Sequence, residues 1–385
     1  MLEILERLLT EAEYFNHIDN LIRKKMLQIS GIKEKRGSKN KIKITKEEQI
    51  FVEEMARNRL KAKLKYSRWD KLFLDSYSLS YSTPEEVANY RAKLLKGKKI
   101  LDVGCGAGLQ SIMLSEYSNV AGFDISKERV LMASLNNRVY GTSAVFKEGN
   151  GLELEIQPQE YDLIFSDPLR PNGSKERKLE ELEPNPLEIM KKYASEVESF
   201  VFDLPPFMDK EKLSHIPGVL EYLSVGGKLS RLTLYSSKTE GRLLRATILP
   251  SEARIESDSS EVPITTDKIG KFLLVPDDAL FYSSLYGNYC NKLGIGLLWT
   301  EKRKAIFSSD SKIAGFLGET YETIEVCDQN RLLESNFLRE YGKVFFRYSP
   351  EDYYLEKKKI EKSMHGSGNL YIFKKGSQLI LSKRV

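Results

Sequence analysis

The residues best suited to chemistry lie in the stretch ILDVGCGAG, residues 100–108. Asp102 stands two residues ahead of three alternating glycines, Gly104, Gly106 and Gly108. Glycine adopts positive φ and lets a ligand approach the backbone closely. An apolar run precedes the loop and a helical pattern follows it, so the free N–H groups of a helix N-terminus are expected behind the glycines. Loops of this kind bind dinucleotides or S-adenosylmethionine.

Three details favour S-adenosylmethionine over a dinucleotide. The glycines are spaced GxGxG and not GxGxxG. The Asp102 carboxylate would repel a pyrophosphate, but it suits the cationic methionine end of S-adenosylmethionine. Asp124, at the end of the next apolar run, can accept from the ribose hydroxyls, and Asn150, after the third run, can accept from the adenine amine. These details disfavour an NAD-dependent dehydrogenase and a purely structural turn.

The elements that position these residues form a regular series. Apolar runs at 98–103, 119–126, 144–150, 161–168 and 198–207 predict strands, and the patterns at 109–117 and 127–140 predict helices, the second with Gly141 as its C-cap. Strands that alternate with helices predict an α/β fold with a parallel, doubly wound sheet. The stretches 226–237 and 241–250 are interpreted as a hairpin that closes this sheet.

Three domains are expected. Residues 1–76 form a helical, basic region, in which Thr45 and Glu48 have the spacing of a capping box. Residues 77–262 form the ligand-binding α/β domain, and residues 263–385, with irregular alternation of strands and helices, form a smaller α+β domain.

The motifs ILDVGCGAG, GFDIS and FKEGN resemble motifs I, II and III of class I S-adenosylmethionine-dependent methyltransferases, over about residues 98–250. The resemblance implies a Rossmann-like sheet. It places Asp102 and the glycines at the methionine moiety, Asp124 at the ribose and Asn150, where the family usually has Asp, at the adenine. The predicted cofactor site also includes the adjacent residues Cys105, Ile125 and Gly151. Cys105 is interpreted as a small filler of the loop.

The segment 77–95 is similar to the one that folds over the cofactor in trimethylguanosine-synthase-like RNA methyltransferases, which adds Tyr81, Ser82 and Thr83 to the site. The structural alternative for Thr83 is a helix N-cap with Pro84 at the first helical position. Over residues 51–385 the order of motifs also resembles methyltransferases with a C-terminal THUMP-like domain, in which the fourth motif commonly reads Asp-Pro-Ala-Arg-Arg.

Two acids compete for the position beside the substrate. Asp167 and Pro168 follow the fourth predicted strand, and Asp203 ends the fifth. Methyltransferases of exocyclic base amines carry an acid or amide, prolines and an aromatic residue after the fourth strand. Asp167 is favoured because the fourth strand is expected to end nearer the methyl group. Arg170 can stack on a base or hold a phosphate, and Tyr81 or Phe207 can replace the missing aromatic ring. For each acid, a loop-capping role is the alternative.

The charge pattern indicates a nucleic-acid partner. Fourteen Lys or Arg stand against six Asp or Glu between Lys33 and Lys71, whereas the whole chain has a net charge of +5. A cluster of this kind is typical of RNA contact, and a solvated helix face is the alternative. The hypothesis is therefore a methyltransferase of a purine base in tRNA or rRNA. A protein or small-molecule methyltransferase, or a non-catalytic protein that binds S-adenosylmethionine and RNA, are the other candidates.

The remaining composition excludes several classes. Three cysteines and three histidines are too scattered to predict a disulfide framework or a metal site. No apolar run is long enough for a transmembrane helix and no signal-peptide pattern is present, so no membrane contact and a cytoplasmic location are expected. The sequence does not predict an oligomeric state.

Overall fold

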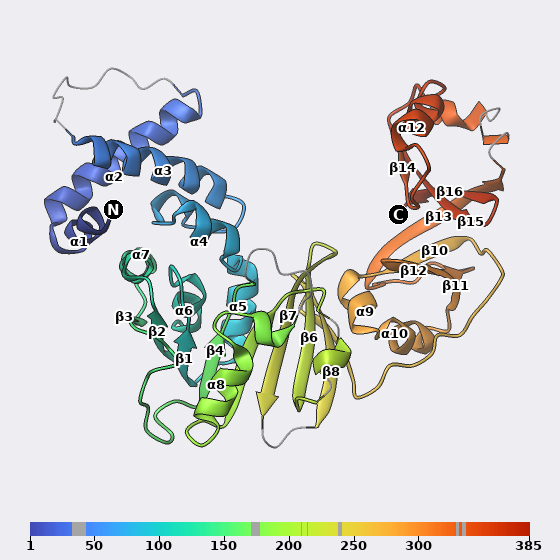
Figure 1. The fold of residues 1–385 in the computed structure, drawn as a ribbon. Coiled ribbons are helices and arrows are strands. Elements are labelled where there is room, and N and C mark those ends of the chain that lie inside the picture. The colour runs from blue at the N-terminus through green and yellow to red at the C-terminus, as the bar shows by residue number, and fades with distance from the viewer. Residues whose placement is uncertain are drawn as a thin grey trace. The chain divides into compact units, whose positions relative to one another are not determined.

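A computed structural model describes residues 1–32, 44–170, 178–208, 210–213, 215–237, 241–328, 331–332 and 336–385. The chain packs as two compact units (Figure 1). One comprises Met1–Val219 and Leu232–Gly241, and the other comprises Leu220–Arg231 and Arg242–Val385. The predicted domain boundaries at 76/77 and 262/263 fall inside these units.

The first unit is built on a sheet with the strand order β3-β2-β1-β4-β5-β7. Its strands are β1 (Lys99–Val103), β2 (Asn119–Asp124), β3 (Val145–Glu148), β4 (Leu163–Ser166), β5 (Ser199–Leu204) and β7 (Lys228–Ser237). The first five run parallel, and β7 pairs antiparallel with β5. The five parallel strands and the Rossmann-like fold predicted from the sequence are confirmed. The strand order reverses between β1 and β4, where sheets of this type bind their ligands.

The helices of the sheet region follow the expected pattern. They are α5 (Glu85–Leu94), α6 (Leu109–Leu114), α7 (Lys127–Tyr140) and α8 (Pro186–Tyr193). Gly141 ends α7 with a φ of 71°, as the C-cap prediction requires. Short 3₁₀ turns at Trp69–Lys71, Leu179–Glu181 and Lys210–Leu213 connect other elements.

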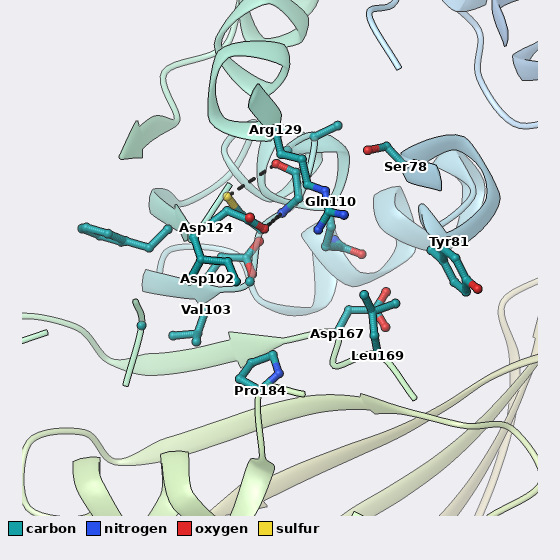
Figure 2. A pocket seen from close by; sticks show the side chains of 18 of the residues that line it. Ser78, Tyr81, Asp102, Val103, Gln110, Asp124, Arg129, Asp167, Leu169 and Pro184 are labelled. Carbon is teal, nitrogen blue, oxygen red and sulfur yellow. Dashed lines mark hydrogen bonds between the residues drawn. The ribbon is translucent and has the colours of Figure 1, made fainter. Parts of the chain in front are cut away.

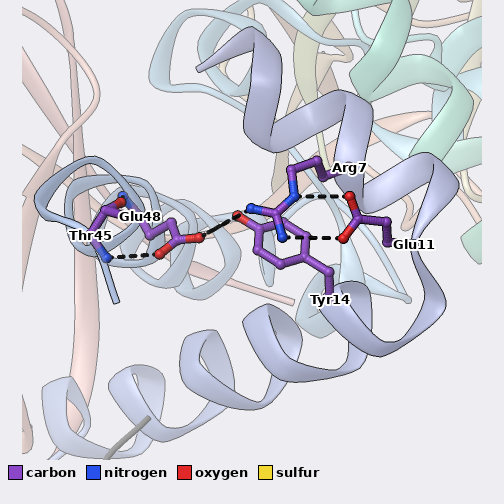
Figure 3. A network of polar contacts seen from close by, with 5 residues as sticks. All are labelled: Arg7, Glu11, Tyr14, Thr45 and Glu48. Atoms are coloured by element: carbon purple, nitrogen blue, oxygen red, sulfur yellow. Dashed lines mark hydrogen bonds and ion pairs between the residues drawn. The ribbon is translucent and has the colours of Figure 1, made fainter. Parts of the chain in front are cut away.

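The N-terminal region is helical, as predicted, and it belongs to the first unit. It comprises α1 (Leu2–Thr10), α2 (Ala12–Ile29), α3 (Lys46–Ala62) and α4 (Ser76–Tyr81). The capping box of α3 is confirmed, because Glu48 N–H donates to Thr45 Oγ1 at 3.1 Å and Thr45 N–H donates to Glu48 Oε2 at 2.8 Å. The Tyr14 hydroxyl donates to Glu48 Oε1 at 2.7 Å, and the Arg7 guanidinium covers the Tyr14 ring (Figure 3). Polar contacts therefore tie α1, α2 and α3 together.

The prediction for residues 226–250 is wrong in one respect. Residues 228–237 and 242–249 do form strands, β7 and β8 (Arg242–Leu249), but these strands are not neighbours in the sheet order. The sequence interpretation missed a preceding strand, β6 (Gly218–Val225). Gly226 and Gly227 both have positive φ and form the turn after β6, whereas they were interpreted as the start of a strand. β8 pairs antiparallel with β9 (Ala253–Ser257).

The second unit contains a seven-stranded sheet with the order β11-β12-β10-β13-β16-β15-β14. The strands are β10 (Phe272–Pro276), β11 (Gly296–Glu301), β12 (Lys304–Ser309), β13 (Gly318–Cys327), β14 (Tyr341–Phe346), β15 (Gly368–Lys375) and β16 (Gln378–Arg384). Its described residues include the helices α9 (Asp278–Ser283), α10 (Tyr286–Lys292) and α12 (Tyr353–Glu361) and the 3₁₀ turn Asn336–Glu340. All strand pairs are antiparallel except β14 with β15. A second, C-terminal sheet region was predicted and is present.

Candidate active site

A cavity of about 700 Å³ lies in the first unit, at the carboxyl ends of its parallel strands (Figure 2). Its walls come from α4, the glycine loop after β1, the end of β2, the turn after β3 and the segment after β4. The predicted residues that line it are Tyr81, Ser82, Thr83, Asp102, Gly104, Cys105, Gly106, Gly108, Asp124, Ile125, Asn150, Gly151, Asp167 and Arg170. The size is that of a site for a small-molecule ligand.

The glycine loop is shaped for close approach to a ligand. Gly104, Gly106 and Gly108 have φ values of 81°, 55° and 80°, which other residues rarely adopt. A Cβ on Gly108 would lie 2.7 Å from the Ala133 Cβ, and a Cβ on Gly151 would lie 2.3 Å from Val103 Cγ1. A side chain at Gly108 or Gly151 therefore has no room beside the cavity wall.

Asp102 is buried at the end of β1, with only 2% of its surface exposed. The Ser111 hydroxyl donates to Oδ2, and Oδ1 has no hydrogen-bond partner among the described residues. Burial raises the pKa of Asp102 to about 7; the Ser111 bond opposes this shift, and the negative charges of Asp167 and Asp124 add to it. A buried carboxylate beside two like charges is stabilised by a bound cation.

Asp124, at the end of β2, is oriented by its own backbone surroundings. Gly106 N–H donates to Oδ2 at 2.8 Å and Ser126 N–H donates to Oδ1 at 2.9 Å (Figure 2). Each carboxylate oxygen keeps further acceptor capacity. The neighbouring Ile125 is 75% exposed at the cavity, so it offers an apolar surface next to the acid.

Asn150 lines the cavity, but its side chain is bound within its own turn. Leu152 N–H donates to Oδ1 at 3.0 Å, and Nδ2 donates to Glu153 Oε1 at 2.9 Å. These bonds fix the amide, and the second lone pair of Oδ1 is what remains for an adenine amine. Its assignment to the adenine stays a prediction.

Cys105 occupies the loop as a half-buried thiol. Burial raises its pKa well above the ordinary value, and the charges of Asp102 and Asp124 add to the effect. Since only the thiolate is a good nucleophile, Cys105 is suited to filling space in the loop.

The segment from α4 to Thr83 is held over the cavity by two residues that follow α3. Lys65 Nζ donates to the carbonyl oxygens of Leu79 at 2.6 Å and Ser82 at 3.2 Å. The Tyr66 hydroxyl donates to the Thr83 carbonyl at 2.6 Å. These bonds place Tyr81, Ser82 and Thr83 along one wall.

The alternative role for Thr83, as a helix N-cap, is not observed. α5 begins at Glu85, its N-cap is Pro84, and no side chain caps it. The Thr83 hydroxyl instead donates to Asp167 Oδ2 at 3.3 Å. Thr83 therefore serves the cavity and not the helix.

The segment after β4 presents Asp167 to the cavity. The Ser166 hydroxyl donates to the Val103 carbonyl at 2.7 Å, which ties the end of β4 to β1. Leu169 exchanges backbone hydrogen bonds with Glu183 at 2.8 and 2.9 Å. Asp167 is half-buried between these anchors and Arg170 is exposed. Pro168 is buried and is not among the lining residues, so it shapes the loop.

Asp203 is not among the residues that line the cavity, which corrects its assignment as a substrate-facing acid. Its Oδ1 accepts from Arg91 Nη2 at 2.5 Å and from Thr233 Oγ1 at 2.6 Å, and Arg91 and Asp203 are each 1% exposed at their side chains. Although burial opposes it, the Asp203 charge raises the pKa of Arg91 above its ordinary value. Phe207 is also absent from the cavity lining.

Several lining residues were missed by sequence reasoning. The main ones are Tyr77, Ser78, Gln110, Arg129, Glu183 and Pro184. Gln110 and Arg129 stand in the first turns of the helices that follow the glycine loop and Asp124. Both residues come just after a recognisable motif, so the sequence could have indicated them. Nothing in the sequence around Glu183 indicates a place in the cavity wall.

The predicted basic region from Lys33 to Lys71 is only partly described. Lys33, Lys35, Arg36, Lys39, Lys41 and Lys43 lie outside the described residues. Of the others, Arg59 is buried in an ion pair with Asp19 at 2.7 Å, and Lys65 holds backbone carbonyls. Arg68 donates to the Val139 carbonyl at 2.5 Å. These three side chains therefore have structural partners, whereas Lys46, Lys61, Lys63 and Lys71 are exposed.

Two further features concern the described part of the chain as a whole. Within it, His, Cys, Asp and Glu side chains form no group of three or more that could hold a metal ion. None of its helices combines the length and apolar character needed to span a membrane.

Comparison with known proteins gives these residues a context. Residues 94–228 match the model of a methyltransferase domain. An uncharacterized S-adenosylmethionine-dependent methyltransferase of Mycobacterium tuberculosis is 27% identical over 275 residues, which cover 69% of this chain and 73% of that protein. A ubiquinone biosynthesis O-methyltransferase of Aliivibrio fischeri is 36% identical over 72 residues, 18% of this chain and 31% of that protein.

The fold has a counterpart among solved structures. The crystal structure of a putative methyltransferase from Porphyromonas gingivalis W83 superposes with a TM-score of 0.78 and 18% identity, and covers 96% of this chain and 98% of that one. The likeness extends over both units and shows a shared fold.

The cavity fits S-adenosylmethionine, the cofactor that these comparisons imply. The unpartnered Oδ1 of Asp102, beside two further carboxylates, suits a positively charged ligand. The three loop glycines, with positive φ, and Gly151 line the cavity without side chains, so a ligand can approach their backbone closely. The donor set therefore agrees with a cationic adenosyl cofactor.

Proposed function

Because the protein is an S-adenosylmethionine-dependent methyltransferase, we propose that it methylates a purine base in RNA, either tRNA or rRNA. One observation carries this proposal. Asp167 and Tyr81 border the same cavity, on the same side in Figure 2, and Tyr81 is 51% exposed. A carboxylate acceptor next to an accessible aromatic face matches a flat base that carries an exocyclic amine.

Asp167 orients the acceptor amine in this proposal. Its carboxylate accepts an amine hydrogen, so that the nitrogen lone pair faces the methyl group, and it can take the proton released on transfer. The Thr83 hydroxyl, which donates to Asp167 Oδ2, fixes the carboxylate for this task. Tyr81 supplies the stacking surface; its ring packs 4.7 Å from that of Tyr77. Arg170, exposed at the cavity, contacts a phosphate or the base.

The cofactor supplies a methyl group on an activated sulfonium, and the protein contributes position and exclusion of water. Asp102 binds the cationic methionine end, Asp124 the ribose hydroxyls and Asn150 the adenine amine. The raised thiol pKa of Cys105 and its place in the glycine loop leave no role for a covalent cysteine intermediate.

RNA contact is assigned to the basic segment 33–71. The exposed Lys46, Lys61, Lys63 and Lys71 supply charge in the described part. The resemblance of residues 77–95 to trimethylguanosine-synthase-like RNA methyltransferases supports RNA as the substrate, and the resemblance to methyltransferases with a THUMP-like domain adds to it by analogy.

The experiment is methyl transfer from labelled S-adenosylmethionine to total RNA from a strain that lacks the gene, followed by mass spectrometry of the nucleosides. A labelled methylguanosine or methyladenosine is expected, and Asp167→Ala should abolish it. If the wild-type protein binds the cofactor but labels no RNA, the RNA assignment fails. Label in the protein or small-molecule fraction would then identify the substrate class, and no label anywhere would indicate a non-catalytic binder.

A further inference from the structure

The cavity is lined by charges of both signs. Four carboxylates, from Asp102, Asp124, Asp167 and Glu183, line it together with two guanidinium groups, from Arg129 and Arg170. The acids explain the cationic parts of the cofactor, its sulfonium and ammonium groups. They do not explain Arg129, which lies in the first turn of α7.

Arg129 has no acidic partner. Among the described residues no carboxylate lies within ion-pair distance of its guanidinium, and the side chain is half-buried. Guanidinium groups bind carboxylates readily. It is therefore unusual that Arg129 lines a cavity with four carboxylates and forms an ion pair with none of them. An unpaired, partly buried cation in a cavity wall points to an anionic group on the ligand.

The Tyr77 ring holds the guanidinium by its face. The Arg129 Cζ lies 4.4 Å from the centroid of that ring, a cation–π contact. Stacking uses the flat face of a guanidinium and leaves its N–H edges free for a carboxylate. Tyr77 belongs to α4 and Arg129 to α7, so two elements that are distant in sequence fix this group.

A second polar group lies next to Tyr77. Ser78 lines the cavity and is 7% exposed, and its hydroxyl has no hydrogen-bond partner among the described residues. Arg129 and Ser78 lie along the side of the cavity opposite Pro184 in Figure 2. A buried hydroxyl without a partner costs free energy unless a ligand satisfies it.

We propose that Arg129, with Ser78 beside it, binds the α-carboxylate at the amino-acid end of S-adenosylmethionine. The ligand is a zwitterion at that end, and the cavity offers both complements: Asp102 for the ammonium and Arg129 for the carboxylate. The assignment depends on the cofactor and not on the methylated substrate, so it goes beyond the proposed RNA activity.

The test compares two ligands that differ only by this carboxylate, S-adenosylmethionine and its decarboxylated form. Calorimetric titration of the full-length protein should show that the wild type binds S-adenosylmethionine at least tenfold more tightly. Arg129→Gln should weaken S-adenosylmethionine by about 10- to 100-fold, the usual effect of losing a charged hydrogen-bonded pair, and change the affinity for the decarboxylated ligand less than twofold. Ser78→Ala should lower the preference by a few-fold.

The matched control is Lys127→Gln, which removes a positive charge from the same helix turn. Lys127 is exposed and pairs with Glu6 at 2.6 Å, and it is not among the lining residues, so both ligands should bind it as they bind the wild type. The proposal is overturned if Arg129→Gln weakens both ligands equally, which would show that Arg129 only shapes the wall through Tyr77. It is also overturned if neither affinity changes; a loss of affinity for RNA alone would then assign Arg129 to a substrate phosphate.

Discussion

Asp167 and Asp203 follow the apolar cores of neighbouring parallel strands, β4 and β5. Asp167 lines the cavity with a neutral hydroxyl, that of Thr83, as a hydrogen-bond donor at 3.3 Å. Asp203 is buried against the Arg91 guanidinium at 2.5 Å. Burial and access to the cavity separate these two acids: Asp167 is half-buried and lines the cavity, and Asp203 is buried and is not among the lining residues. Asp203 therefore serves packing against Arg91 of α5, whereas Asp167 is accessible to a ligand in the cavity.

The largest effect in this comparison is expected from Asp203→Ala. The substitution leaves the Arg91 charge buried with its ion-pair partner removed, which costs about 3–5 kcal/mol of stability. Urea denaturation followed by circular dichroism measures the free energy of unfolding. Asp203→Asn keeps an acceptor for Arg91 and Thr233 and should lose less. A loss below about 1 kcal/mol in Asp203→Ala would mean that the pair is dispensable and that the comparison is mistaken.

Asp167→Ala should lower the methylation rate and leave the stability nearly unchanged, the opposite of what is expected for Asp203→Ala. We expect the methylation rate to fall at least 100-fold, roughly 2.7 kcal/mol of transition-state stabilisation, with the free energy of unfolding nearly unchanged because Asp167 is only half-buried. The measurement pairs single-turnover methyl transfer with urea denaturation of the same preparation. A variant that keeps its rate within threefold would remove Asp167 from the chemistry.

The two acids also show which features can be predicted from the sequence: local elements can, and contacts between distant residues cannot. Short-range signals were sufficient for the five parallel strands, the glycine loop, the capping box at Thr45 and the C-cap at Gly141. The partner of Asp203 was beyond reach, because Arg91 lies 112 residues away in sequence and only tertiary packing brings the two together. The same holds for Thr83, which bonds Asp167 across 84 residues where local rules predicted a cap.

Strand β6 shows a different limit. Its eight residues are almost wholly buried, including the polar Glu221 and Ser224. Polar and apolar residues therefore do not alternate along it, and no period separates strand from helix. The glycine pair after it, which is a turn signal, was assigned to the next strand. The glycine pair therefore allows the end of β6 to be predicted from the sequence, but nothing in the sequence predicts that the preceding segment is a strand.

A third effect, of intermediate size, concerns the acid on β1. The pKa of Asp102 is about 7 in the ligand-free protein, raised mainly by burial, and a cationic cofactor binds its ionised form. Cofactor affinity should therefore fall about tenfold for each pH unit below 7 and level off above it. Calorimetric titration between pH 5.5 and 8.5 measures this dependence, and Asp102→Asn should flatten it. A flat wild-type profile would show that Asp102 does not meet the cationic end.

The raised pKa of Asp102 also determines how the free energy of unfolding changes with pH. The folded, ligand-free protein keeps a proton on Asp102 in the range from about pH 4 to pH 7, in which the unfolded chain has lost it. This group therefore makes the free energy of unfolding decrease as the pH rises through that range. Saturating cofactor should reduce this contribution, because it favours the ionised carboxylate.

The smallest effect should come from Thr83→Val, which removes the neutral donor to Asp167. The bond is long, at 3.3 Å, so we expect a loss of about 0.5–1 kcal/mol. This corresponds to a two- to fivefold lower single-turnover rate, with cofactor affinity unchanged, and Thr83→Ser should restore the rate. If Thr83→Val were as damaging as Asp167→Ala, the hydroxyl itself would be required for transfer. Asp167 would then depend on Thr83 as strongly as Asp203 depends on Arg91, and the two acids would no longer differ in how much each needs that residue.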